Sequence, residues 1–185
     1  MSVKNIKYIE NLSRYAHKSD LLRYCLLYIY GGVYLDVDLK QKLPLDDIIN
    51  MSNNSDLITS FGLGGNIPKI NKEEFNENNK QYQPIISNGF LFSISKNPIF
   101  LDLIHKIISL PFKNRHPVNI YYFHNYLKKH NSKLNSFNNM LINDINVYLF
   151  KEQTIELGGK NAFMNDKNEI VMYSNNYWKK KVYLK

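Results

Sequence analysis

The segment from Leu21 to Asp38 constrains the fold of this chain most, because a helical pattern stops there at two glycines and an alternating pattern follows at once. Glycine accepts the left-handed conformation that a helix C-cap needs, so Gly31 and Gly32 predict the end of a helix. From Val33 to Asp38, apolar and polar residues alternate with the period of a β-strand. A helix joined directly to a strand indicates an α/β arrangement here.

The predicted strand places Tyr34, Asp36 and Asp38 on one face, since alternate residues of a strand point to the same side. Its two carboxylates would lie about 7 Å apart, at a rise of roughly 3.3 Å per residue. Such a pair can divide its work between a hard divalent cation and the ligand that the cation carries. The pattern therefore predicts a site for a metal ion and a diphosphate at the end of this strand.

The start of the preceding helix supplies further polar groups. Ser19 is a good N-cap, and Asp20 suits the positive end of the helix dipole. Arg23, three residues after Asp20, shares its face and offers a planar fork of donors to a phosphate. An apolar stripe at helical spacing predicts the buried face of this helix, and it consists of Leu21, Leu22, Cys25, Leu26 and Ile29.

These residues resemble the sugar-binding region of glycosyltransferases that carry a DXD motif. The resemblance rests on Ala16, Ser19-Asp20, Arg23, Gly31-Gly32, Tyr34 and Asp36-Val37-Asp38. The run looks like family 32, which includes fungal mannosyltransferases and bacterial capsule and lipooligosaccharide enzymes, and it is similar to the large clostridial glucosylating toxins. The resemblance implies a GT-A-like α/β fold, with a mixed sheet flanked by helices. It also implies a nucleotide-diphosphate sugar as donor substrate and Mn²⁺ or Mg²⁺ as cofactor.

The resemblance assigns a role to each matching position. Asp38 would ligate the metal directly, while Asp36 would contact the nucleotide ribose and the water shell of the metal. Asp20 and Arg23 fall where the family contacts the donor sugar and the diphosphate, and Tyr34 falls where a tyrosine lines the donor pocket. These implied contacts make Asp38, Arg23 and Asp36 the candidate catalytic residues.

Later segments resemble the family less closely. Asn88, within Ile86–Phe90, matches an asparagine that approaches the donor sugar, and Trp178 matches a tryptophan that closes over the donor. The family usually carries a histidine or an acidic residue near that tryptophan, whereas this chain offers Asn176 as an oxygen ligand. Family members also usually begin with a strand-helix unit that binds the nucleotide base. Because the Ser19 helix comes so early, we expect that unit to be lacking.

Length and composition limit the class of protein. The chain has 185 residues, 44% of them hydrophobic, and we expect one domain over residues 1–185. Its single cysteine, Cys25, cannot form an internal disulfide and predicts a buried thiol. No stretch approaches the ~20 apolar residues of a membrane span, and the first residues lead into no signal-peptide core. We therefore expect a location in the cytoplasm or at the cytoplasmic face of a membrane.

The remaining pattern alternates between helices and strands, as in a layered α/β domain. We expect helices at about 3–15, after Pro44 through Ile49, from Asn97-Pro98 to Ile108, at about 118–129 and at 134–141. We expect strands at 57–59, 85–94, 147–150 and 170–173.

The resemblance implies metal-dependent transfer of a sugar to an unknown glycan, lipid or protein acceptor, with retention of anomeric configuration as in the family. Two alternatives stay open. The first is a domain that binds metal or sugar nucleotide without turnover, which the early Ser19 helix and the altered residues near Trp178 motivate. The second is a basic nucleic-acid-binding module, which only the net charge of +8 and the tyrosines motivate. We expect no nucleic acid as partner, because the lysines are scattered along the chain rather than gathered in blocks.

Overall fold

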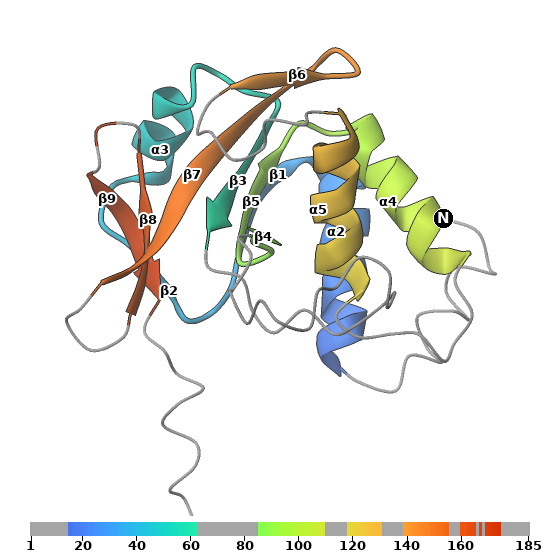
Figure 1. Ribbon diagram of the computed structural model, residues 1–185, viewed down its shortest axis with the longest axis horizontal. Coiled ribbons are helices and arrows are strands. Elements are labelled where there is room, and N and C mark those ends of the chain that lie inside the picture. The colour runs from blue at the N-terminus through green and yellow to red at the C-terminus, as the bar shows by residue number, and fades with distance from the viewer. Residues whose placement is uncertain are drawn as a thin grey trace, which may run out of the picture.

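The structure is a computed structural model, and it describes residues 15–62, 85–109, 118–130, 139–155, 160–165, 167 and 169–174. In this part of the chain a mixed β-sheet carries helices on both of its faces (Figure 1). The expected mixed α/β architecture is therefore confirmed, and it is consistent with a GT-A-like domain. No helix in the described ranges is long and apolar enough to cross a membrane.

The described helices are α2 (Tyr15–Tyr30), α3 (Leu45–Met51), α4 (Pro98–Ile108) and α5 (Val118–His130). Helix α4 begins as its sequence predicts. The Asn97 side chain accepts a hydrogen bond of 3.0 Å from the Ile99 amide, and Pro98 occupies the first turn, where its missing N–H is not needed. The expected helices after Pro44 and from residue 118 are also present.

The described strands are β1 (Gly32–Leu35), β2 (Leu39–Gln41), β3 (Leu57–Gly62), β4 (Ile85–Ile86), β5 (Phe90–Ser93), β6 (Met140–Ile142), β7 (Ile145–Ile155), β8 (Lys160–Met164) and β9 (Ile170–Ser174). Their order in the sheet is β1-β5-β3-β7-β8-β9-β2, with β4 beside β3 and β6 beside β7. Strands β3 and β7 run parallel, and the other described pairs are antiparallel.

The sheet is strongly curved. Its curvature follows from the fact that β1 and β2, which lie at opposite edges of the sheet, are consecutive in the sequence. Strand β1 ends at Leu35 and β2 begins at Leu39, so the facing ends of the two edges lie at most about 14 Å apart. Seven strands in a flat sheet would separate the edges by roughly 29 Å, at about 4.8 Å per step. The short segment that connects these two edge strands includes Asp36 and Asp38.

Three expectations from the sequence need correction. The strand expected at residues 85–94 is interrupted at Ser87–Gly89, which separates β4 from β5. The helix expected at 134–141 is wrong in its described part, where Met140 and Leu141 belong to β6 and pair antiparallel with β7. Strand β7 is longer than the expected 147–150, and its extension pairs with β8. Long-range pairing thus overrode local propensity here.

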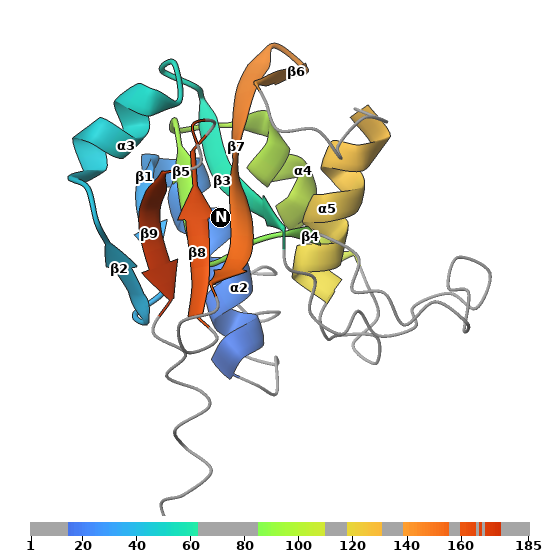
Figure 2. The same cartoon turned by 60° about the vertical axis from the view of Figure 1, so that its left-hand side comes forward.

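The core has two parts, one on each face of the sheet. Helices α2, α4 and α5 pack against one face, where Leu21, Leu103 and Leu127 are fully or almost fully buried. Helix α3 lies over the other face, where Ile48 packs with Phe90 and other buried residues. Figure 2 shows the three longer helices on the side of the sheet opposite α3.

Helix α2 differs from its prediction in two respects. Ser19 and Asp20 lie inside the helix, which already includes Tyr15, so Ser19 is not an N-cap and Asp20 is not in the described first turn. The predicted buried stripe is also partly wrong. Its members Leu22, Leu26 and Ile29 are exposed, whereas Leu21 and Cys25 are buried with Tyr24 and Leu27. The buried face is thus rotated relative to the apolar stripe, and the free thiol of Cys25 is buried as expected.

Candidate functional site

The two glycines after helix α2 set the spacing between the helix and the sheet. Gly31 has a φ angle of +67° and donates a hydrogen bond of 2.9 Å from its amide to the Leu27 carbonyl, which ends the helix as predicted. A Cβ atom on Gly31 would lie 2.6 Å from the backbone nitrogen of Ser95. The absence of a side chain therefore lets the end of α2 approach the segment after β5 closely.

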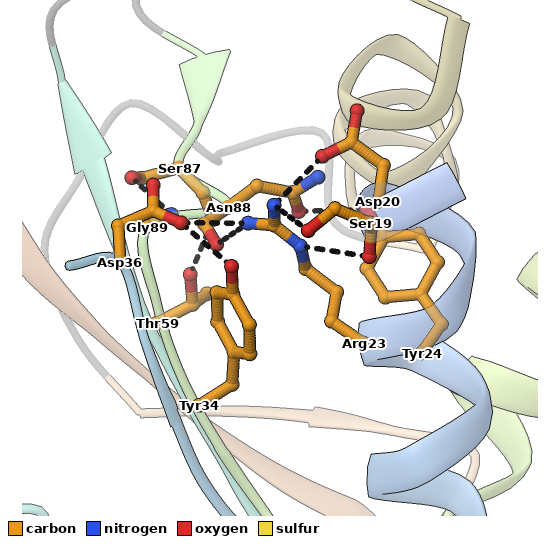
Figure 3. A network of polar contacts seen from close by, with 10 residues as sticks. All are labelled: Ser19, Asp20, Arg23, Tyr24, Tyr34, Asp36, Thr59, Ser87, Asn88 and Gly89. Atoms are coloured by element: carbon orange, nitrogen blue, oxygen red, sulfur yellow. Dashed lines mark hydrogen bonds and ion pairs between the residues drawn. The ribbon is translucent and has the colours of Figure 1, made fainter. Parts of the chain in front are cut away.

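Arg23 is the centre of the candidate site. Its side chain is only 7% exposed, and its Nη2 atom lies 3.0 Å from Asp20 Oδ1. Its Nη1 atom lies 3.3 Å from Asp36 Oδ1, beyond the end of β1. Figure 3 shows the guanidinium group between the two carboxylates. Because a buried charge needs partners, these two acids make the burial of Arg23 possible.

The other donors of Arg23 are also used. Nη1 donates to the backbone carbonyl of Asn88, and Nη2 and Nε donate to the Ser19 side chain and carbonyl at 3.3 and 3.4 Å. The carbon of the guanidinium lies 4.2 Å from the centre of the Tyr34 ring, which is close enough for a cation–π contact. Arg23 thus joins helix α2, the end of β1 and the β4–β5 connection.

Tyr34 and Asp36 share a face, as their spacing predicts. The Tyr34 hydroxyl donates a hydrogen bond of 2.8 Å to Asp36 Oδ1, the oxygen that also contacts Arg23. Burial raises the pKa of Tyr34, and the hydrogen bond to Asp36 raises it further. A protonated phenol is therefore maintained as the donor, and two donors hold one oxygen of Asp36 in place.

The second oxygen of Asp36 lies beside Gly89. The Asp36 amide donates 2.8 Å to the Gly89 carbonyl, and a Cβ on Gly89 would come within 3.2 Å of Asp36 Oδ2. Gly89 therefore leaves room for this carboxylate. The Asp36 side chain is 40% exposed, so the buried network of Arg23 presents it at the surface.

Asp38 does not lie on a strand face with Asp36, and this corrects the prediction of one strand from Val33 to Asp38. Strand β1 ends at Leu35, the partner of Phe90, and the chain turns two residues later. Val37 and Asp38 form a turn, in which the Leu39 amide donates 3.0 Å to the Asp36 carbonyl. Val37 is fully exposed between the two aspartates. The position of Asp38 is therefore set by this turn and not by the alternation of side chains along a β-strand.

The chemistry of the two aspartates fits a hard cation. Asp38 is half-buried and makes no hydrogen bond or ion pair with the residues that the structure describes. In the same ranges no group of three or more acidic, histidine or cysteine side chains could hold a metal by itself. Mg²⁺ and similar ions are commonly held by one or two carboxylates together with substrate phosphates. Asp36 and Asp38 are therefore suited to a metal that arrives with a diphosphate.

Asn88 lies in the interruption between β4 and β5 and is buried. Its Oδ1 atom accepts a hydrogen bond of 2.7 Å from the Tyr24 hydroxyl. Its Nδ2 atom is buried and has no partner among the described residues. An unsatisfied buried donor costs about 1–3 kcal/mol, so this atom fits an acceptor oxygen that a ligand brings.

The structure thus brings Asp20, Arg23, Tyr34 and Asp36 together with Asn88, and it places Asp38 in the adjoining turn. Trp178 and Asn176 lie outside the described residues. Sequence reasoning assigned no role to Tyr24 or Gly89. The position of Tyr24 next to Arg23 could have indicated a role in the site. Its partner Asn88 is 64 residues away, so no local sequence pattern predicts their hydrogen bond.

A comparison with protein families supports the resemblance seen in the sequence. Residues 2–55 match the model of the glycosyltransferase sugar-binding region containing the DXD motif. The match includes Asp20, Arg23, Tyr34, Asp36 and Asp38, and it supports a glycosyltransferase that uses a nucleotide-sugar donor. A search of curated proteins found no match.

Proposed function

We propose that this protein is a metal-dependent glycosyltransferase that moves a sugar from a nucleotide-diphosphate donor to an acceptor, with retention of anomeric configuration. The observation that carries the proposal is that the buried Arg23 holds Asp20 and Asp36 together inside the segment that matches the sugar-binding region. Arg23 thereby fixes two carboxylates, one from α2 and one from the residue after β1, relative to each other.

The donor would bind across three elements. Asp20 on α2 and Asn88 between β4 and β5 would hydrogen-bond hydroxyl groups of the sugar. Asp36, held by Arg23 and Tyr34, would accept from the ribose. Trp178 would cover the donor and exclude water that otherwise hydrolyses it.

Asp38 and Asp36 would hold Mn²⁺ or Mg²⁺, with Asn176 as a further oxygen ligand. When bound, such a cation neutralises negative charge on a leaving diphosphate. Asp38 is the more direct candidate, because its carboxylate has no competing partner in the described ranges. The Arg23 guanidinium is engaged by two carboxylates, a carbonyl and a serine, so its contribution to diphosphate binding would pass largely through the position of Asp36.

Retention is proposed from the family resemblance and from the roles of the acids. Asp20 and Asp36 are paired with Arg23, and neither is an obvious covalent nucleophile. We therefore propose attack by the acceptor from the face that the nucleotide leaves. A β-linked product formed from an α-linked donor, detected by NMR, would contradict retention.

Calorimetry with uridine and guanosine diphosphate sugars, with and without Mn²⁺, tests donor binding, and release of free sugar or transfer tests turnover. We expect binding that depends on Mn²⁺, together with turnover of at least one donor. Binding without turnover would favour an inactive sugar-nucleotide-binding domain. Absence of both, together with binding of RNA or DNA, would favour the basic nucleic-acid-binding alternative.

A further inference from the structure

Tyr24 is a buried tyrosine whose ring is fixed from two sides. It is fully buried in helix α2, beside Arg23. Its ring stacks on Phe100 of α4 at a centroid distance of 5.4 Å and meets the edge of Phe123 of α5 at 5.9 Å. These contacts set the direction of the ring, and therefore the place of its hydroxyl group.

That hydroxyl group ends at Asn88. It donates a hydrogen bond of 2.7 Å to Asn88 Oδ1, in a pair that is buried on both sides. Burial raises the pKa of Tyr24, and the negative charge of Asp20 raises it further, so the phenol keeps its proton. The donor in this bond is thus always present.

A carboxamide has two different ends, so a partner that fixes one end also fixes the other. With Oδ1 held by Tyr24, the Nδ2 group of Asn88 is left as a buried donor without a partner in the described part of the chain. The backbone carbonyl of Asn88 is held separately by Arg23. The main chain and the side chain of Asn88 therefore have independent supports from adjacent residues of α2.

We infer that Tyr24 is a positioning residue, which orients the Asn88 carboxamide so that Nδ2 donates to an oxygen of the donor sugar. This inference rests on the proposed function, because it deepens the role of Asn88 in donor binding. Without the Tyr24 hydroxyl, the carboxamide could turn over and present Oδ1 where Nδ2 had been. An acceptor oxygen on the sugar would then face another acceptor, and the donor would bind less well.

The test uses Tyr24→Phe, which keeps the ring and both aromatic contacts and removes only the hydroxyl group. We expect KM for the donor to rise roughly three- to tenfold, the usual effect of one lost hydrogen bond, with a smaller change in kcat. Asn88→Ala should raise KM at least as much. The double variant should resemble Asn88→Ala, because Tyr24 would act through the Asn88 side chain alone.

Tyr126→Phe is the matched control. Tyr126 on α5 also loses a phenol hydrogen bond on this substitution, that of 2.9 Å to Asp102, but it belongs to no part of the proposed site. We expect its KM to stay at the wild-type value. Equal changes in KM for Tyr24→Phe and Tyr126→Phe would assign the effect to general loosening and overturn the inference.

The side-chain amide signal of Asn88 in a ¹⁵N NMR spectrum supplies a readout that needs no donor. In Tyr24→Phe we expect this signal to shift and to exchange faster with water, while the other side-chain amides stay in place. An unchanged Asn88 signal overturns the positioning role, whatever the kinetics. If the wild type binds no donor, the proposed function fails by itself, and the Asn88 signal still decides whether Tyr24 orients the carboxamide.

Discussion

Arg23 and Asp36, thirteen residues apart, are joined by an ion pair of 3.3 Å that links helix α2 to the turn after β1. The arginine is buried and the aspartate is partly exposed, so the pair connects the interior to the surface of the site. The same guanidinium reaches Asp20 and the Asn88 carbonyl. The geometry of the candidate donor site therefore depends on one side chain.

This dependence predicts that Arg23→Lys damages folding although it keeps the charge. A lysine ammonium is a compact donor and cannot reproduce the planar fork that reaches Asp20, Asp36 and Asn88 together. We expect a loss of about 1–3 kcal/mol in the free energy of unfolding, because buried acceptors lose their donor. Urea denaturation followed by circular dichroism measures this loss. If Arg23→Lys unfolds at the same urea concentration as the wild type, the network around Arg23 contributes little to stability.

Asp38→Asn separates metal binding from folding. The substitution keeps the size of the side chain and removes one negative charge from a carboxylate with no partner among the described residues, so the melting temperature without metal should hardly change. Transfer or donor hydrolysis should fall on the order of 10²–10³-fold, the usual loss for one preorganised electrostatic group. Activity assays over a panel of nucleotide sugars, and thermal melts with and without Mn²⁺, measure both effects.

Asp36→Asn is to be compared with Asp38→Asn in the same assays. If Asp36 contacts the ribose, its loss should reduce activity less than Asp38→Asn, and excess Mn²⁺ should restore activity in Asp38→Asn alone. Equal losses in the two variants would indicate that both carboxylates ligate the metal. If the wild type shows neither turnover nor a rise in melting temperature with Mn²⁺, metal-dependent transfer is wrong.

Gly89→Ala should disturb the site without unfolding the protein. Its new Cβ would lie 3.2 Å from Asp36 Oδ2, so the partly exposed carboxylate must shift by a few tenths of an ångström. We expect the free energy of unfolding to stay within about 0.5 kcal/mol of wild type, while the affinity for the donor falls. Calorimetric titration measures that affinity. In an Asp36→Asn background the same substitution should have a different effect on affinity, since the two residues are in contact; strict additivity would argue against this coupling.

Gly31→Ala and Gly32→Ala form a matched pair. Both glycines have positive φ angles, +67° and +90°, so each substitution places alanine in a conformation that costs about 1–2 kcal/mol. A Cβ on Gly31 would also meet the Ser95 nitrogen at 2.6 Å, whereas one on Gly32 would meet nothing within 4 Å. Denaturant unfolding should therefore show Gly31→Ala as the less stable variant by roughly 1–3 kcal/mol. Equal free energies of unfolding for the two variants would mean that the segment after β5 moves away from the new Cβ of Gly31→Ala without strain.

His124 should make the stability of the protein fall in mild acid. Burial, and after it the charge of Lys128, lowers the pKa of His124 to about 4, and its ring stacks on Phe61. An unfolded histidine titrates near 6.5, as a rough reference. As the pH falls from about 6.5 toward 4, His124 binds a proton in the unfolded chain but stays neutral in the folded protein. The free energy of unfolding is therefore highest above this pH range and decreases as the pH falls through it.

The variant His124→Gln should flatten that dependence, since glutamine does not titrate. Urea unfolding of wild type and variant at about pH 7 and pH 5 compares the two slopes. His105→Gln, which changes an exposed histidine on α4, is the control and should keep the wild-type slope. The same slope in all three proteins would rule out His124 as the source of acid sensitivity.

Features that depend on neighbouring residues could be predicted from the sequence. Gly31 ends helix α2, and Asn97 caps α4 with its own side chain. The spacing of two residues places Asp36, directly after β1, on the same side as Tyr34, and the two form a hydrogen bond. In each case the interaction closes within a few residues, so the backbone conformation that the sequence favours is enough to form it.

Features that depend on distant partners were decided by the tertiary structure. The alternation from Val33 to Asp38 predicts one strand, yet β1 ends at Leu35 and the chain turns at Val37 and Asp38, where the Leu39 amide donates a hydrogen bond to the Asp36 carbonyl. Tyr24 and Asn88 are 64 residues apart, and only the packing of α2 beside the sheet brings them within 2.7 Å.

Helix α2 shows the division most clearly. Its sequence determines that residues around Leu22, Leu26 and Ile29 form a helix with an apolar stripe, but in the structure these three side chains are exposed. Arg23 and Tyr24 are buried instead, since Asp20, Asp36 and Asn88 satisfy their polar groups. The spacing of apolar residues indicates which side chains would gain most from burial. Which face of the helix is buried is determined by residues from elsewhere in the chain that pack against it and satisfy its polar groups.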